Sequence, residues 1–284
     1  MKKKRTYKPY HYLIIIFLGG LSVVILYPLV WMLMTSFKTN VDIRTNRAKF
    51  FPTEWTLEGY RTAFEKAPIA NWFINSILIT VIITLAVIVT STLMGYVFAK
   101  YEFRFKRTLF VLLLATMMVP PQVTMIPRYL MIQKLHLFDT RGALIVPALV
   151  SAFSVYLAKQ FIADIPDSLC EAAKIDGANG WHILWNITIP TVMPSITICT
   201  FLTLTNSFKL FDQNLALTGG LPSVIQNGAK VNVTELLALN IYSTYNINKK
   251  YHGVAQTKAV IFFLLVAVLA LIQQAATRKK EVEQ

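Results

Sequence analysis

Residues 72–99 read WFINSILITVIITLAVIVTSTLMGYVFA, and this stretch contains no Asp, Glu, Lys or Arg. A helix needs about 20 apolar residues to cross the hydrocarbon core of a bilayer. Inside that core every backbone N–H and C=O group must find its partner within the chain, which a single apolar run achieves as an α-helix. The stretch therefore predicts a membrane-spanning helix, with residues 67–71 before it at the membrane interface.

Five other long, mostly apolar runs set the expected architecture. Together with the first, they place spans at about residues 12–37, 72–99, 108–130, 142–160, 190–211 and 256–277. We therefore expect an all-α fold, a polytopic transmembrane bundle of six spans within residues 12–277. Residues 1–11 form a basic N-terminus and residues 278–284 a tail. No small-residue cleavage site follows the first run, so we expect a retained helix and not a signal peptide.

The composition agrees with a protein that lies in lipid. Hydrophobic residues make up 55% of the 284 residues and charged residues 15%, which leaves too little polar surface for a soluble globule. The net charge of +14 does not indicate a nucleic-acid partner, because the cations lie between apolar runs and not on one soluble face. Basic residues at both ends and in the short loop 100–107 predict that both termini are cytoplasmic.

Motifs for enzymatic chemistry are absent from the sequence. None of the 11 glycines belongs to a GxxxxGK[ST] loop that could hold nucleotide phosphates, and neither HExxH nor GxSxG occurs. Cys170 and Cys199 lack the spacing of a metal site. We therefore expect no catalysis, metal or cofactor in this chain. A membrane-embedded enzyme is the rival class and would need buried His, Asp or Glu clusters, while Na⁺ coupling through backbone carbonyls stays open.

The polar segment 159–190, KQFIADIPDSLCEAAKIDGANGWHILWNITIP, is predicted to form two short helices in the cytoplasm. Pro166 suits the first turn of a helix, where its missing N–H costs nothing, so residues 168–176 should be helical. Gly177 is placed to end that helix in a left-handed conformation. A second short helix should then cover residues 181–186.

The same segment carries a family resemblance. Glu171-Ala172-Ala173, Gly177, Ile187 and Ile189-Pro190 resemble the pattern EAA, three residues, G, nine residues, I-x-L-P of permeases in binding-protein-dependent ABC transporters, with Ile189 in place of Leu. The resemblance implies a fold like that of a type I ABC importer permease. It also implies that the loop docks on a separate ATPase, which uses the ATP, through Glu171, Ala172, Ala173, Asp176, Gly177, Ile187 and Pro190.

Further resemblance points to the carbohydrate-uptake branch. Residues 27–31, 55–60 and 117–123 look like its MalG-type subunit, whereas residues 203–218 and 234–238 look more like the MalF-type partner. Which half of a heterodimer the chain occupies, and whether it is recombined or engineered, stays open. The resemblance implies import of a sugar or oligosaccharide across the bacterial cell membrane. The implied partners are a second permease, an ATPase dimer and an extracytoplasmic sugar-binding protein.

A sugar pathway needs amide and hydroxyl groups, because a polyol stripped of water must recover its hydrogen bonds. Candidates for contact with the substrate are Asn75, Gln122, Thr203, Asn206, Ser207 and Gln213. The alternative is that such side chains only join helices to one another. A permease for a polyamine, a phosphonate or glycerol phosphate is a further alternative, but a charged substrate favours charges in the cavity, and the spans carry few.

Overall fold

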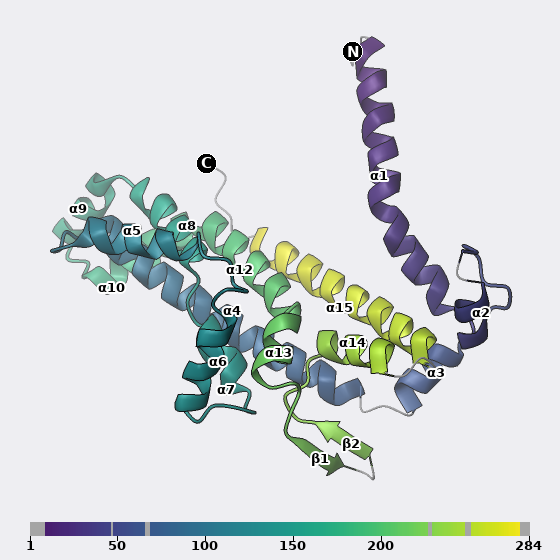
Figure 1. Ribbon diagram of the computed structural model, residues 1–284. Helices are drawn as coiled ribbons and strands as arrows, with labels where there is room; N and C mark the ends of the chain where they lie inside the picture. Colours follow the sequence, from purple (N-terminus) through teal and green to yellow (C-terminus); the bar gives the residue numbers. More distant parts are fainter. Residues whose placement is uncertain (1–8, 47, 66–68, 227–228, 248–250, 279–284) are drawn as a thin grey trace. The chain divides into compact units, whose positions relative to one another are not determined.

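The computed structural model describes residues 9–46, 48–65, 69–226, 229–247 and 251–278 (Figure 1). The chain divides into two compact units. The first comprises residues 1–67 and 241–261, and the second comprises residues 68–240 and 262–284. Each unit is described separately below.

The first unit consists of helices. α1 (Pro9–Ser36) is apolar, and most of its side chains are exposed. α2 (Asn40–Thr45) begins at Thr39, whose side-chain oxygen accepts from the Asp42 N–H at 3.1 Å. α3 (Glu58–Glu65) meets the start of α15 (His252–Arg278), where a Cβ placed on Gly59 would lie 2.5 Å from Thr257 Oγ1. Only glycine permits this approach.

α4 (Ile69–Lys100) is the central helix of the second unit. α8 (Ala152–Ala163) packs along it so closely that a Cβ on Gly95 would lie 2.7 Å from the Ala158 Cβ. α12 (Met193–Phe208) packs on α4 as well. Small residues at such contacts let membrane helices approach one another.

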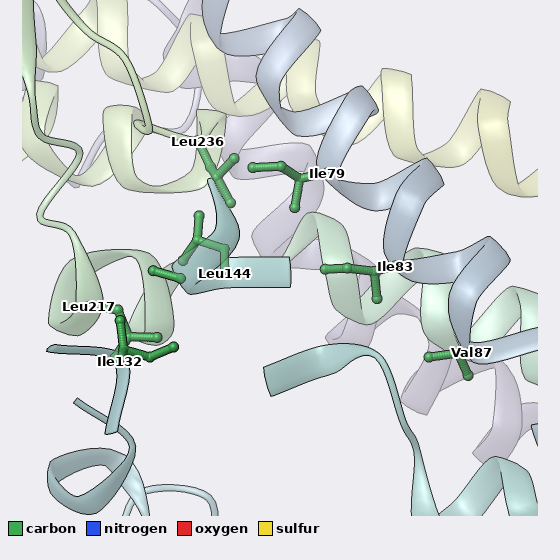
Figure 2. Packing of buried hydrophobic residues seen from close by; sticks show 8 residues of the cluster. Ile79, Ile83, Val87, Ile132, Leu144, Leu217 and Leu236 are labelled. Atoms are coloured by element: carbon green, nitrogen blue, oxygen red, sulfur yellow. The ribbon is translucent and has the colours of Figure 1, made fainter. Parts of the chain in front are cut away.

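Buried aliphatic side chains form a core around the middle of α4. Ile79, Ile83 and Val87 of α4 cluster there with residues of shorter elements. Figure 2 shows Ile79 pointing toward Leu236, with Leu144 close by. The remaining elements of the second unit are α5 (Lys106–Thr116), α6 (Met125–Lys134), α7 (Gly142–Ile145), η1 (Val146–Ala148), α9 (Asp167–Ile175), α10 (Gly180–Ile183), η2 (Leu184–Thr188), α11 (Ile189–Thr191), α13 (Phe211–Leu217) and part of α14 (Leu237–Ile247).

A β-hairpin is present that the sequence analysis did not predict. β1 (Ser223–Gln226) pairs antiparallel with β2 (Ala229–Asn232), and Val224 lies opposite Val231. Strands of four residues are too short for a clear alternation of polar and apolar residues. The hairpin is a small addition to a helical fold.

The long helices correspond to most of the predicted spans. Among the described residues, four are long and apolar enough to cross a membrane: Tyr12–Ser36, Ile69–Lys100, Gly142–Ala163 and His252–Ala276. A fifth candidate is the pair Gly180–Thr191 and Met193–Phe208, bent by 73°. The expected span 108–130 is divided between α5 and α6, because Pro120-Pro121 interrupts helical hydrogen bonding. The helical class is confirmed, and the count of six spans stays a prediction.

Candidate functional site

The first helix of the polar segment 159–190 lies close to its predicted place. α9 covers Asp167–Ile175, and Asp176 is its C-cap. Pro166 is the N-cap, with φ −58° and ψ 133°, so its predicted position in the first turn was wrong by one residue. An extended Pro166 turns the chain away from α8, and α9 starts in a new direction.

Gly177 ends α9 as predicted. Its φ is +87°, in the left-handed region that favours glycine. The Ala178 N–H donates to the Ala173 carbonyl at 2.9 Å, and the Gly177 N–H donates to the Lys174 carbonyl at 3.0 Å. These two bonds are the Schellman arrangement of a helix C-terminus. They fix the direction in which the chain leaves α9.

The second helix is longer than the predicted range 181–186. Asn179 caps α10 through a bond from the His182 N–H at 2.9 Å, and the helix continues through the π-helix η2 into α11. In η2 the Ile189 N–H bonds to the carbonyl of Leu184, five residues earlier. Pro190 has no N–H to donate, so this wider turn lets the helix continue past it. Ile187 therefore lies in the π-helix and Pro190 in α11.

Large apolar side chains are exposed on this segment. Leu169, Ile175, Trp181 and Trp185 are between 52% and 86% exposed, and the two tryptophan rings are 5.6 Å apart. Of the motif residues, Glu171, Ala172, Asp176 and Gly177 are exposed beside them, and Ala173 is half-buried. The paired tryptophan rings form an exposed apolar surface, and such surfaces are typical of interaction sites. We call these four apolar residues the apolar docking patch; the sequence analysis missed it, although aromatic residues in a polar loop are a readable signal.

Lys100, the last residue of α4, holds the beginning of α9. Its Nζ donates to the Ile165 carbonyl at 2.7 Å and to Asp167 Oδ1 at 2.6 Å. The Lys100 side chain is 13% exposed and that of Asp167 is 78% exposed. The hydrogen bond and the charge of Lys100 hold the pKa of Asp167 below its usual range. We call these contacts the Lys100 clasp.

The first part of α4 carries a different set of contacts. Asn75 Nδ2 donates to the Val233 carbonyl at 2.7 Å, and Ser76 Oγ accepts from the Leu237 N–H at 3.0 Å. Both side chains are buried. A cavity of about 260 Å³ lies beside Asn75 and is also lined by Arg141 and by Val224 of the hairpin. Asn75 therefore has a structural partner, and its contact with substrate stays a prediction.

The other pathway candidates lie on several elements. Thr203, Asn206 and Ser207 are on the last turns of α12, and Asn206 is exposed while Ser207 is buried. Gln213 is half-buried on α13, and Gln122 is exposed in the turn between α5 and α6. Their contact with substrate stays a prediction. Among the described residues, no group of three His, Cys, Asp or Glu could hold a metal ion.

Asn214, the neighbour of Gln213, has a structural role that the sequence analysis missed. Its Nδ2 donates to Thr218 Oγ1 and to the Thr234 carbonyl, both at 2.9 Å, and its Oδ1 accepts from the Leu236 N–H at 2.9 Å. The side chain is fully buried. It fastens the segment that also contacts Asn75 and Ser76.

Comparison with known proteins agrees with the family resemblance. Residues 91–282 match the family described as binding-protein-dependent transport system inner membrane component. The chain belongs to this family. It is therefore an inner membrane component of a transport system and a multi-pass membrane protein, and its family is not one of enzymes.

Several relatives of this inner membrane component are sugar permeases by name. AmyD of Thermoanaerobacterium thermosulfurigenes, a probable starch degradation products transport system permease protein, is 46% identical over 45% of this chain and 40% of its own length. The arabinooligosaccharides transport system permease protein AraQ of Halalkalibacterium halodurans is 29% identical over 74% of this chain and 76% of its own. The diacetylchitobiose uptake system permease protein NgcG of Streptomyces coelicolor is 30% identical over 66% of this chain and 64% of its own length.

A solved structure supports the fold of this inner membrane component. It is a crystal structure of a bacterial ABC transporter involved in the import of the acidic polysaccharide alginate. The matched chain has a TM-score of 0.78 and 20% identity, with 96% of this chain and 99% of that chain covered. The fold of an ABC importer permease is thereby confirmed.

Proposed function

We propose that this chain is one permease subunit of an ABC importer and forms half of the translocation pathway for an oligosaccharide. The observation that carries the proposal is the apolar docking patch on a segment with the coupling motif, held to α4 by the Lys100 clasp. A separate cytoplasmic ATPase dimer binds this patch and supplies the energy. The chain itself has no phosphate-binding loop and hydrolyses no ATP.

Motion of the ATPase reaches the pathway through the helices that the segment contacts. The ATPase displaces α9, and the Lys100 clasp passes the displacement to the end of α4. Asn75 and the cavity beside it lie near the other end of α4. Packed helices with fixed contacts can carry such a displacement between distant sites. A second permease subunit completes the pathway, and a loaded extracytoplasmic binding protein delivers the sugar.

The oligosaccharide substrate is supported by the relatives and by the chemistry of the pathway candidates. Amide and hydroxyl side chains suit a polyol, because they replace the hydrogen bonds that it loses with water. AmyD, AraQ and NgcG are all permeases for saccharides by name. Both termini and segment 159–190 face the cytoplasm in this proposal.

Two exposed isoleucines provide a matched test of ATPase docking. Ile175 is 86% exposed on the docking patch, and Ile225 is 83% exposed on the hairpin. Ile175→Asp should abolish co-purification of the ATPase and uptake of labelled oligosaccharide, whereas Ile225→Asp should leave the bound ATPase unchanged. Retention of the ATPase by Ile175→Asp would contradict the docking role. A complex that binds its ATPase but transports a polyamine in place of sugars would contradict the substrate class alone.

Single cysteines test the orientation in a variant without Cys170 and Cys199. Asn179→Cys should react with an impermeant reagent only from the cytoplasmic side, and Ser223→Cys only from outside. The opposite pattern would reverse the topology.

A further inference from the structure

A pocket of about 500 Å³ lies beside the turn between α4 and α5. Its described lining combines phenylalanine rings with cations: Phe98, Phe103, Phe105 and Phe110, and Lys106, Arg107 and Lys159. A volume of this size is in the range of small-molecule sites. Neither the coupling motif nor the pathway candidates include any of these residues.

The apolar wall of the pocket is built from rings that pack on one another. The ring centroid of Phe98 lies 5.8 Å from that of Phe103 and 5.4 Å from that of Phe110. Phe110 in turn stacks on Tyr156 of α8 at 6.4 Å. These contacts hold the wall in place before any ligand arrives, which lowers the entropic cost of binding.

The polar side of the pocket has an excess of positive charge. Glu102 is the acid among its described lining residues, and it pairs with Lys106 at 2.7 Å. The Nζ of Lys159 lies 5.2 Å from the Phe110 ring centroid, so this cation sits over the apolar wall. Arg107 is exposed at the start of α5. Lys159 and Arg107 therefore supply positive charge beyond the Lys106–Glu102 pair.

The pocket lies where this basic cluster meets the apolar surface of α5. Leu109, Val111 and Leu112 follow directly on α5 and are about half exposed. Because most of α5 lies within the predicted span 108–130, we expect this surface to face acyl chains. A ligand that fills this place needs an anionic group for the cations and apolar chains for the phenylalanine wall.

We propose that this pocket binds the phosphodiester headgroup of an anionic phospholipid. Arg107 and Lys159 contact the phosphate, since guanidinium and ammonium groups donate charge-assisted hydrogen bonds to phosphate oxygens. The phenylalanine wall contacts the first carbons of the acyl chains. Basic pockets between membrane helices bind anionic headgroups in this way. Free phosphate shares the anionic chemistry but has nothing to place against the rings.

Lipid retention by the full transport complex tests the proposal. The complex is purified into nanodiscs of phosphatidylcholine mixed with phosphatidylglycerol, and native mass spectrometry then measures which lipid stays bound. Wild type should retain phosphatidylglycerol in preference to phosphatidylcholine. Combining Arg107→Gln with Lys159→Gln should reduce that preference on the order of tenfold. Combining Arg107→Lys with Lys159→Arg, which keeps both charges, should keep most of the preference for phosphatidylglycerol.

Two controls distinguish lipid binding at this pocket from a general effect of positive charge and from binding of free phosphate. Lys134→Gln removes one cation at the exposed end of α6, outside the pocket, and should leave the preference unchanged. If the Gln pair changes nothing, or if Lys134→Gln lowers the preference as much as the pair does, the proposal is wrong. If inorganic phosphate displaces the retained lipid, the pocket is a site for free phosphate and the lipid assignment fails.

Discussion

The two ends of α4 hold their neighbours by different chemistry. Near its beginning, the neutral and buried side chains Asn75 and Ser76 bond to backbone groups at Val233 and Leu237. At its last residue, Lys100 bonds to the Ile165 carbonyl just before α9 and to the exposed carboxylate of Asp167 in α9. Figure 1 shows α9 and α10 grouped at one end of α4, away from the hairpin.

The bonds of Asn75 and Ser76 form a permanent attachment, whereas the Lys100 clasp is an attachment that can be changed. Buried neutral hydrogen bonds are costly to break, because each leaves a polar group without a partner and without water. An ion pair with an exposed carboxylate is weaker and depends on salt and pH. We therefore expect the contacts near Asn75 to set stability and the Lys100 clasp to set coupling.

The largest effect on stability should come from Asn214→Ala. Asn214 fastens the segment to which Asn75 and Ser76 bond, so the variant tests the permanent attachment. The change removes three buried hydrogen bonds and leaves the Thr234 carbonyl and the Leu236 N–H without their partner. The expected cost is about 3 kcal/mol of unfolding free energy. Thermal unfolding in detergent measures it. Leu215→Ala, at the next and exposed position, is the control, and equal melting of the two variants would contradict this role of Asn214.

Gly177→Val should have a smaller effect on stability and a large effect on transport. A Cβ at Gly177 has no neighbour within 4 Å, so the cost comes from φ +87° alone and is about 1–2 kcal/mol. The strain changes the direction of α10, and sugar uptake per inserted transporter should be lost. Glu171→Gln, which keeps the shape and removes a charge, should act more mildly.

Two glycine controls sharpen that prediction. Gly177→Asn should retain more uptake than Gly177→Val, because Asn tolerates the left-handed conformation. Gly180→Ala should be close to neutral, because its Cβ would meet only the Tyr101 hydroxyl oxygen at 3.9 Å. Normal uptake by Gly177→Val at normal membrane abundance would contradict the coupling role of this segment.

The Lys100 clasp should affect coupling more than folding. Lys100→Met removes both bonds of the clasp and should lower uptake several-fold, with ATPase activity continuing in the intact complex. Asp167→Asn removes only the ionic partner and should lower uptake less. Because both variants break the same contact, the double variant should resemble Lys100→Met alone. Additive losses of uptake would show that the two residues act separately.

The smallest expected effect is the pH dependence of the clasp. Since the pKa of Asp167 is lowered in the folded protein, its stabilisation is fully present above the usual carboxyl value of 3.8. It is lost as the pH falls through the lowered value. The difference in melting temperature between wild type and Asp167→Asn should therefore disappear in strong acid and shrink in high salt. A difference that is unchanged in acid would exclude the ion pair as its cause.

Patterns of residues close together in the sequence predicted local structure, whereas contacts between distant residues were not predicted. The direction of the chain at Gly177 follows from a glycine placed after a helical stretch, and it was predicted correctly. The Lys100 clasp joins residues 67 positions apart, and no local pattern reveals such a pairing. We expected one continuous span at 108–130, although this range contains Pro120-Pro121, and did not predict that helix would be absent between Thr116 and Met125.

The close contact of Gly95 with Ala158 restricts how α4 and α8 can move. Where only the Ala158 methyl group and backbone atoms of α8 lie against Gly95, sliding along the contact would force atoms into overlap. We therefore expect α4 and α8 to move together as one rigid body and not to slide past each other. A displacement of α9 enters this body at two points, through the chain from α8 and through Lys100 at the end of α4. With two points of attachment, we expect a push on α9 to tilt the helix pair as a unit.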